Sequence, residues 1–178
     1  MPGFDLQPVL CGELLSLRPL RDGDFNELYD VAADPLVWEQ HPERERYRLD
    51  VFKTFFAAAM DSKGALVAVD NVSAKIIGSS RFSNFDPIKN QIEVGYTFLA
   101  RSYWGRNYNL EMKKLMLGHA FQFVDKIVFF IGENNFRSRK AIERIGATFF
   151  ARIERAPKQG AQYDAVMYLI SKSEWIDR

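Results

Sequence analysis

The sequence is short of the residues that build disulfides and metal sites. Its 178 residues include one cysteine, Cys11, and two histidines, His41 and His119. A single cysteine excludes an intrachain disulfide, and so few cysteines and histidines argue against a zinc site. We therefore expect no metal, and the low cysteine content fits a reducing compartment.

The sequence also has almost no net charge and no long apolar segment. Its 24 Lys and Arg residues balance 23 Asp and Glu residues, which leaves a formal charge of +1. Such a chain has no overall field that would attract nucleic acid or a membrane surface. The opening "MPGFDLQPVLCGELLSLRPL" lacks the basic segment and apolar stretch of a signal peptide. We expect a cytoplasmic protein that binds neither nucleic acid nor membranes.

The composition that remains is that of one globular domain over residues 1–178. Hydrophobic residues make up 47% and charged residues 26%, and we find no repeat, linker or low-complexity segment. A chain of this length is sufficient for one core.

Apolar periodicity predicts a mixed α/β fold. We expect strands at residues 14–20, 65–70, 74–83, 91–100, 126–131, 148–154 and 164–170, the last two joined by the polar loop "RAPKQGAQY". Helices are expected after Asp22 or Asp24, over the apolar stripe of residues 51–60, over residues 112–123, and over 135–145 with Gly146 as the stop. In the fourth strand, alternation places Glu93 opposite Ile92, Val94, Tyr96 and Phe98.

Two strand-to-helix connections carry the residues of an anion site. "WGRNYN", residues 104–109, combines a glycine, an arginine and two asparagines at a helix start, where free amides bind anions. Glu111 would repel a phosphate, so we expect it to face away. "ENNFRSRKAIERIG", residues 133–146, places cations where the helix dipole disfavours them. The alternatives are a well-capped surface helix and a solvated basic face.

The ordered segments "LLSLRPLRDGDF", "IIGSSRF", "EVGYTFLARSYWGRNYNLEMKKLMLGHAF" and "ENNFRSRKAIERIGA" resemble the GNAT superfamily of acyl-CoA-dependent N-acyltransferases, in particular its RimJ/RimL-type members. The resemblance covers residues 14–175. It implies a single domain with a mixed, mostly antiparallel sheet that is splayed after the fourth strand and flanked by helices. It also implies acetyl-CoA as co-substrate and an amine as acceptor.

The resemblance assigns roles to individual residues. Thr97, Phe98 and Leu99 would bond the pantetheine arm, and Trp104, Gly105, Arg106, Asn107, Tyr108 and Asn109 would hold the pyrophosphate. Asn135 and Ser138 match contacts to the cofactor arm, and Arg137 and Lys140 could reach a phosphate. Glu93 matches the position of a general base, and a water-facing carboxylate is the alternative.

The sequence departs from the family pattern at several positions. Ser102 and Asn107 replace signature residues of the pyrophosphate loop. Ile142 stands where many members have a tyrosine that acts as the general acid. Tyr108, Tyr163 and Tyr168 are therefore equal candidates for an acid.

The segment "WEQHPERERYR" is the expected wall for the acceptor. His41 and Arg46 are its candidate substrate-binding residues, and a solvated charged loop is the alternative. We expect His119, Trp38, Phe52, Phe55 and Phe56 to be packed in the core.

The sequence thus predicts transfer of an acyl group, most simply acetyl, to the amine of a small molecule or a protein N-terminus. Direct attack in a ternary complex is expected because Cys11 is the only thiol. The alternatives are a GNAT-like acyl-CoA-binding module without turnover and another nucleotide-phosphate protein. The latter lacks a phosphate-loop motif. Monomer and homodimer are both compatible with the resemblance.

Overall fold

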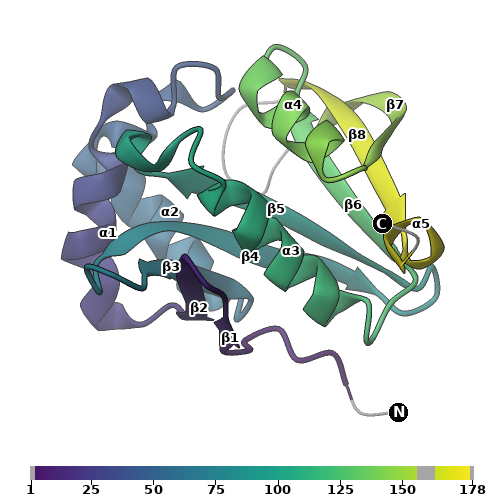
Figure 1. The fold of residues 1–178 in the computed structure, drawn as a ribbon. Helices are drawn as coiled ribbons and strands as arrows, with labels where there is room; N and C mark the ends of the chain where they lie inside the picture. Colours follow the sequence, from purple (N-terminus) through teal and green to yellow (C-terminus); the bar gives the residue numbers. More distant parts are fainter. Residues whose placement is uncertain (1–2, 156–162, 177–178) are drawn as a thin grey trace.

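The computed structural model describes residues 3–155 and 163–176 (Figure 1). Most of the polar loop "RAPKQGAQY" lies outside these residues. The strands are β1 (Leu10–Cys11), β2 (Leu15–Pro19), β3 (Ala65–Asp70), β4 (Ile76–Asp86), β5 (Gln91–Leu99), β6 (Lys126–Gly132), β7 (Thr148–Arg155) and β8 (Tyr163–Ser171). The helices are α1 (Phe25–Ala32), α2 (Leu49–Asp61), α3 (Tyr108–Ala120), α4 (Phe136–Arg144) and α5 (Lys172–Ile176).

The order of elements agrees with the periodicity of the sequence. Among the described strands and α-helices, only β1 and α5 are additional, and both are too short to show a periodic pattern. Gly146 follows α4 with φ = 96°, a backbone conformation that glycine adopts without a steric penalty. The predicted helix stop is therefore confirmed.

Within the described residues the strands form one eight-stranded sheet in the order β1-β2-β3-β4-β5-β6-β8-β7. All neighbours are antiparallel except β5 and β6, which are parallel. These two strands pair only from Gln91 to Glu93 against Lys126 to Val128. Beyond that point they separate, and the splayed, mostly antiparallel sheet predicted from the resemblance is confirmed.

Two hydrophobic cores lie on opposite faces of the sheet. Met112, Met116 and Ala120 of α3 are fully buried against one face, as their helical spacing predicts. Helices α1 and α2 cover the other face. The core on this side contains Phe52, Phe55 and Phe56 of α2, and Trp38 from the segment between the two helices. In Figure 1, α3 crosses one side of the sheet and α1 and α2 lie behind it.

A bulge in β5 changes which side chains share a face. Gly95 pairs with Arg81 and Phe98 with Ser79, so Tyr96 and Thr97 together face the single residue Ser80. Tyr96 has φ = 54°. The alternation predicted for residues 92–98 is therefore wrong beyond Gly95.

The bulge reverses the faces of the residues that follow it. Thr97 now points towards α3, with Ile92 and Val94, and its hydroxyl meets the side chain of Lys113. Phe98 packs against Trp38 and Phe55 on the α2 side, which is also the side of Glu93.

Candidate functional site

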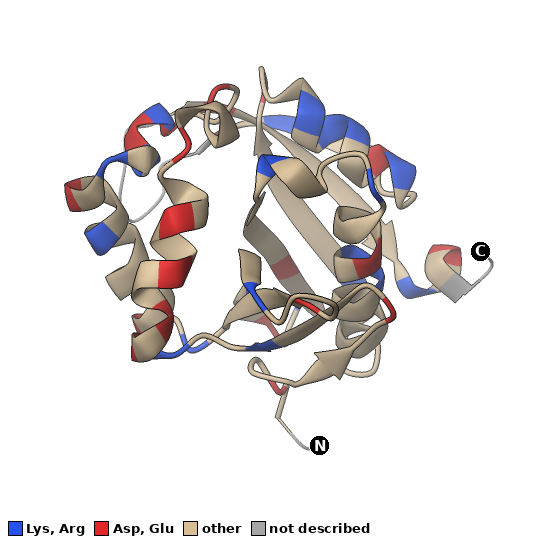
Figure 2. Cartoon of the chain, turned by 60° about the vertical axis from the view of Figure 1, so that its left-hand side comes forward, with Lys and Arg blue, Asp and Glu red and all other residues tan. Residues whose placement is uncertain are grey.

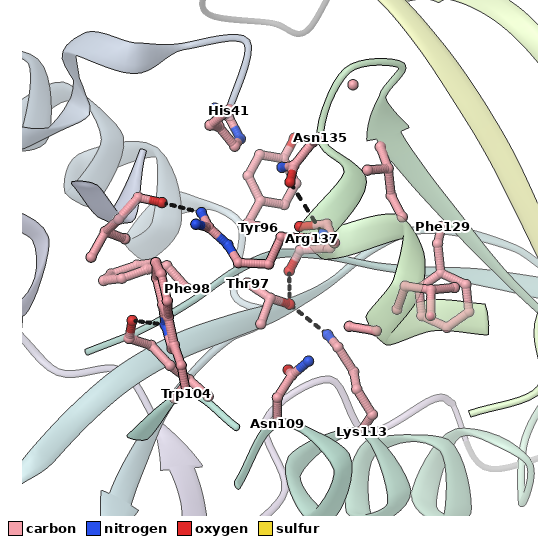
Figure 3. A pocket seen from close by; sticks show the side chains of 18 of the residues that line it. His41, Tyr96, Thr97, Phe98, Trp104, Asn109, Lys113, Phe129, Asn135 and Arg137 are labelled. Atoms are coloured by element: carbon pink, nitrogen blue, oxygen red, sulfur yellow. Dashed lines mark hydrogen bonds between the residues drawn. The ribbon is translucent and has the colours of Figure 1, made fainter. Parts of the chain in front are cut away.

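A cavity of about 280 Å³ lies where β5 and β6 separate. Its walls are residues 94–99 of β5, residues 129–132 of β6, the start of α3, one side of α4, and residues from 37 to 42. Because no described strand pairs with β5 here on its β6 side, backbone N–H and C=O groups along that edge are available to a ligand. Figure 3 shows His41 and Lys113 on different sides of this space.

The turn before α3 has the backbone shape of an anion site. Gly105 and Asn107 have φ = 74° and 65°, and both line the cavity. The amide of Glu111 donates to the carbonyl of Asn107, so the amides before it lie in the unpaired first turn of the helix. The Glu111 carboxylate faces away, as expected, and accepts from the amides of residues 13–15 at 2.9 to 3.0 Å.

Asn107 holds a left-handed conformation that most side chains avoid. We expect Asn107→Ala to lower the free energy of unfolding by about 1 kcal/mol, because a β-carbon is strained at this φ and asparagine tolerates it better than most residues. Asn107→Gly should be nearly neutral. Chemical denaturation of the two variants measures the difference, and equal stability of both would show that the turn relaxes to another conformation.

The start of α4 forms the second wall. The Asn135 side chain, 5% exposed, caps the helix by accepting from the amide of Ser138 at 3.2 Å. The Arg137 guanidinium stacks 4.0 Å from the centre of the Trp104 ring and donates to the carbonyl of Val37 at 2.8 Å. Arg137 therefore connects three parts of the cavity wall.

Basic residues follow one another along α4, as the blue segments of this helix show in Figure 2. They include Arg144, which lines the cavity and donates to Asn107 Oδ1 at 3.1 Å. Helix α4 thus carries both cavity-lining cations, Arg137 and Arg144, and the exposed Lys140.

The cavity collects most, but not all, of the residues singled out in the sequence. Those that line it are His41, Thr97, Phe98, Leu99, Trp104, Gly105, Asn107, Asn109, Asn135, Arg137 and Ser138. Arg106 and Lys140 are exposed outside its lining. The Tyr108 hydroxyl points elsewhere and donates to Asp70 at 2.9 Å, which raises the pKa of the tyrosine.

Glu93 is the last residue of β5 that pairs with β6, at the point where the two strands begin to separate. It is 2% exposed and its Oε2 accepts from Asn84 Nδ2 at 2.6 Å. Its Oε1 leans along the strand, since a β-carbon built on Gly95 would lie 3.1 Å from it. Gly95 itself lines the cavity. A water-facing carboxylate is thereby excluded, and Glu93 sits next to the cavity floor.

His41 and Arg46 contact each other, with Arg46 buried and His41 half-buried. His41 Nδ1 accepts from the amide of Glu43 at 2.9 Å, and Nε2 lies 3.2 Å from Arg46 Nη1. Burial and the positive charge of Arg46 hold the pKa of His41 well below 6.5, so the ring is neutral at pH 7. Arg46 pairs with Glu43 and stacks 4.6 Å from the Phe55 ring, outside the cavity lining. The alternative of a solvated surface loop is wrong for Arg46, whereas the neighbouring Arg44 and Glu45 are exposed.

The sequence analysis missed Lys113. This lysine is 2% exposed and lines the cavity, and its Nζ donates to Ser80 Oγ at 3.2 Å and to Thr97 Oγ1. Its position next to the apolar residues of α3 could have indicated burial. However, two consecutive lysines, Lys113 and the exposed Lys114, are typical of a solvated helix face.

The candidate acids are also separated by the structure. Tyr163 lines the cavity, whereas the Tyr168 hydroxyl is bonded to Glu143 and Arg139 outside it. Ile142 lines the cavity with an apolar surface.

Two further findings concern the described part of the chain. In residues 3–155 and 163–176, no three His, Cys, Asp or Glu side chains come together in a metal-binding arrangement. No helix in that part is both long and apolar enough to cross a membrane.

Comparison with known proteins identifies this architecture. A family model described as an acetyltransferase (GNAT) domain matches residues 15–148. The chain belongs to the GNAT acetyltransferase family. It is therefore an N-acetyltransferase that uses acetyl-CoA and acts on an amine.

Solved structures share the fold of this acetyltransferase. A GCN5-related N-acetyltransferase from Brucella melitensis is 20% identical, with a TM-score of 0.83 over 96% of this chain and 81% of that one. A spermidine N-acetyltransferase from Vibrio cholerae, in complex with CoA and spermine, is 16% identical, with a TM-score of 0.71 over 93% and 99%. RimJ from Mycobacterium smegmatis, in complex with CoA-disulfide, is 18% identical, with a TM-score of 0.70 over 93% and 85%.

The residues of the cavity fit acetyl-CoA. The free strand edge of β5 suits an amide-containing arm, and the first turn of α3 with Arg144 nearby suits a pyrophosphate. Among the described residues, buried Asn109 Oδ1 has no hydrogen-bond partner, and Asn109 lines the cavity, so this oxygen can accept from an N–H of a ligand.

Proposed function

We propose that this acetyltransferase moves the acetyl group of acetyl-CoA directly to a primary amine, in the manner of RimJ/RimL-type enzymes, and that residues 1–178 act as one domain. The observation that carries this proposal is the cavity between β5 and β6, which is lined by residues of α3 and α4 and also by His41 and Trp38. A cavity lined in this way can hold a donor and an acceptor at once.

Residues of β5 and of the two helix starts hold the co-substrate in this proposal. Thr97, Phe98 and Leu99 offer their strand edge, and the turn of residues 104–109 offers its amides. Asn135, Ser138 and Arg137 complete the wall, and the exposed Arg106 and Lys140 attract the phosphates from the rim. Acetyl-CoA supplies an activated acyl group when bound.

Glu93 is the proposed general base. Its Oε1 is directed towards Gly95 on the cavity floor, while the Asn84 amide fixes Oε2. The carboxylate can accept a proton from the acceptor amine, directly or through a water molecule. Tyr163 is the proposed acid among the three tyrosines, because it lines the cavity.

The acceptor is proposed to contact His41, with Arg46 holding the ring in place. The neutral imidazole lies perpendicular to the Trp38 ring, with ring centres 5.6 Å apart. Cys11 is exposed and absent from the cavity lining, which favours direct transfer over an acyl-enzyme. Small-molecule amines and protein N-termini are both acceptor candidates. Nothing in the cavity favours a binding module without turnover.

Acetyl-CoA binding and thiol release test this function. We expect calorimetry to show binding of acetyl-CoA, and free thiol to appear when polyamines, peptide N-termini or aminoglycosides are added. Binding without release for any amine would support the module instead. Absence of binding would overturn the proposed function.

A further inference from the structure

Lys113 places a primary amine inside the cavity of an enzyme that acetylates amines. The side chain extends from α3 towards β5, beside Asn109 one turn earlier, as Figure 3 shows. Its Nζ donates to Ser80 Oγ and Thr97 Oγ1. Within residues 3–155 and 163–176, the structure shows no carboxylate paired with this amine.

The two hydroxyl partners suit an unprotonated amine. A neutral amine has two hydrogens and one lone pair, whereas an ammonium has three hydrogens and no lone pair. Ser80 and Thr97 accept the two hydrogens, and they also bond to each other at 2.8 Å. The lone pair is then left on the nitrogen of a side chain that lines the cavity.

Burial favours the neutral form as well. It lowers the pKa of Lys113 to about 7, and burial is the only cause of this shift. About half of the amine is then unprotonated at pH 7, compared with roughly one in a few thousand for an ordinary exposed lysine. Only the unprotonated amine is a nucleophile.

We propose that Lys113 is an internal acetyl acceptor, which takes the acetyl group of bound acetyl-CoA when no amine substrate is present. The Nζ attacks the thioester carbonyl carbon, an N–C bond forms and the C–S bond breaks. The proton released from the amine goes to the departing thiolate, so the products are N-acetyl-lysine and CoA. The inference rests on the proposed function, because it requires acetyl-CoA in this cavity.

Acetylation would change the cavity. The amide cannot become cationic and keeps one N–H, so it can no longer donate to both Ser80 and Thr97. The added acetyl group must also occupy part of the space of about 280 Å³. We expect the modified enzyme to bind acetyl-CoA more weakly. The modification would therefore inhibit the enzyme when no amine substrate is present.

Mass spectrometry of the full-length enzyme tests this inference. The protein is incubated with acetyl-CoA at neutral pH without an acceptor, and its intact mass is followed. A protease other than trypsin yields one peptide that contains both Lys113 and its exposed neighbour Lys114, which serves as the internal control. Parallel samples contain excess desulfo-CoA as an unreactive competitor, or the variant Lys113→Arg, whose side chain cannot be acetylated in this way.

We expect at least about a tenfold excess of acetyl on Lys113 over Lys114, abolished by desulfo-CoA and absent from Lys113→Arg. Equal acetylation of both lysines, unchanged by desulfo-CoA, would mean that acetyl-CoA reacts with them without the cavity and would overturn the inference. Calorimetry on the same sample separates the two proposals. Binding of acetyl-CoA with Lys113 unmodified overturns only the internal acceptor, whereas absence of binding overturns the proposed function too.

Discussion

Replacing Lys113 by methionine is expected to raise the free energy of unfolding at neutral pH by a few kcal/mol. The lysine loses its proton at a pKa of about 7 in the folded protein, far below the value of about 10.4 in an unfolded chain. Below pH 7 both states are protonated, and the folded state bears the whole cost of a buried cation. Methionine fills similar space without a charge, and Ser80 and Thr97 still bond to each other.

The pH dependence identifies the cause. Between pH 7 and about 10.4 the unfolded state binds more protons than the folded state, so the stability of the wild type rises with pH. The advantage of Lys113→Met should therefore shrink over this range by on the order of 4 kcal/mol. Urea denaturation of both proteins at several pH values measures this difference.

Lys114→Met is the matched control for this series. It makes the same substitution one residue away on α3, at an exposed position, and should leave stability within about 0.5 kcal/mol at every pH. A pH-independent difference between Lys113→Met and the wild type would show that the pKa of Lys113 is not lowered in the folded protein.

Replacing Glu93 by glutamine is expected to lower kcat by roughly 100-fold or more, because glutamine cannot accept the proton of the attacking amine. The substitution keeps the shape of the side chain, and its carbonyl oxygen can still accept from Asn84 Nδ2. The affinity for acetyl-CoA should stay nearly constant, since Glu93 is not part of the cavity lining. Steady-state thiol release and calorimetry measure the two quantities.

Glu154→Gln provides the control for the Glu93 variant. It removes the same charge from an exposed position on β7 and should leave kcat unchanged. Turnover of the Glu93 variant at the wild-type rate would remove Glu93 from the role of base. A parallel fall in acetyl-CoA affinity would instead mean that Glu93 stabilises the part of the sheet where β5 and β6 separate.

Local pattern was enough to predict most of the fold. The apolar stripes of α2 and α3 and the apolar run of β6 specify which faces are buried, because burial of these faces is the main source of stability. The turn before α3 was readable for a similar reason, since Gly105 and Asn107 are residue types that tolerate positive φ.

The bulge at Tyr96 could not be predicted from the local sequence pattern. Tyrosine has no local preference for φ = 54°, and the conformation persists because β4 and α3 pack against β5 and the Arg81 guanidinium of β4 stacks 4.1 Å from the Tyr96 ring centre. The reversal of faces that follows brings Thr97 to Lys113 and Phe98 to Trp38.

The sequence by itself determined the mixed α/β order, the two helix starts that can bind anions, and the family resemblance, because these depend on residues that are neighbours along the chain. Only the tertiary structure decided that Lys113 lies in the cavity while Lys114 lies in solvent, and that Glu93 is buried beside the cavity floor. Two adjacent lysines are chemically identical until the chain folds. Burial, which depends on residues distant in sequence, is what lowers the pKa of Lys113 to about 7.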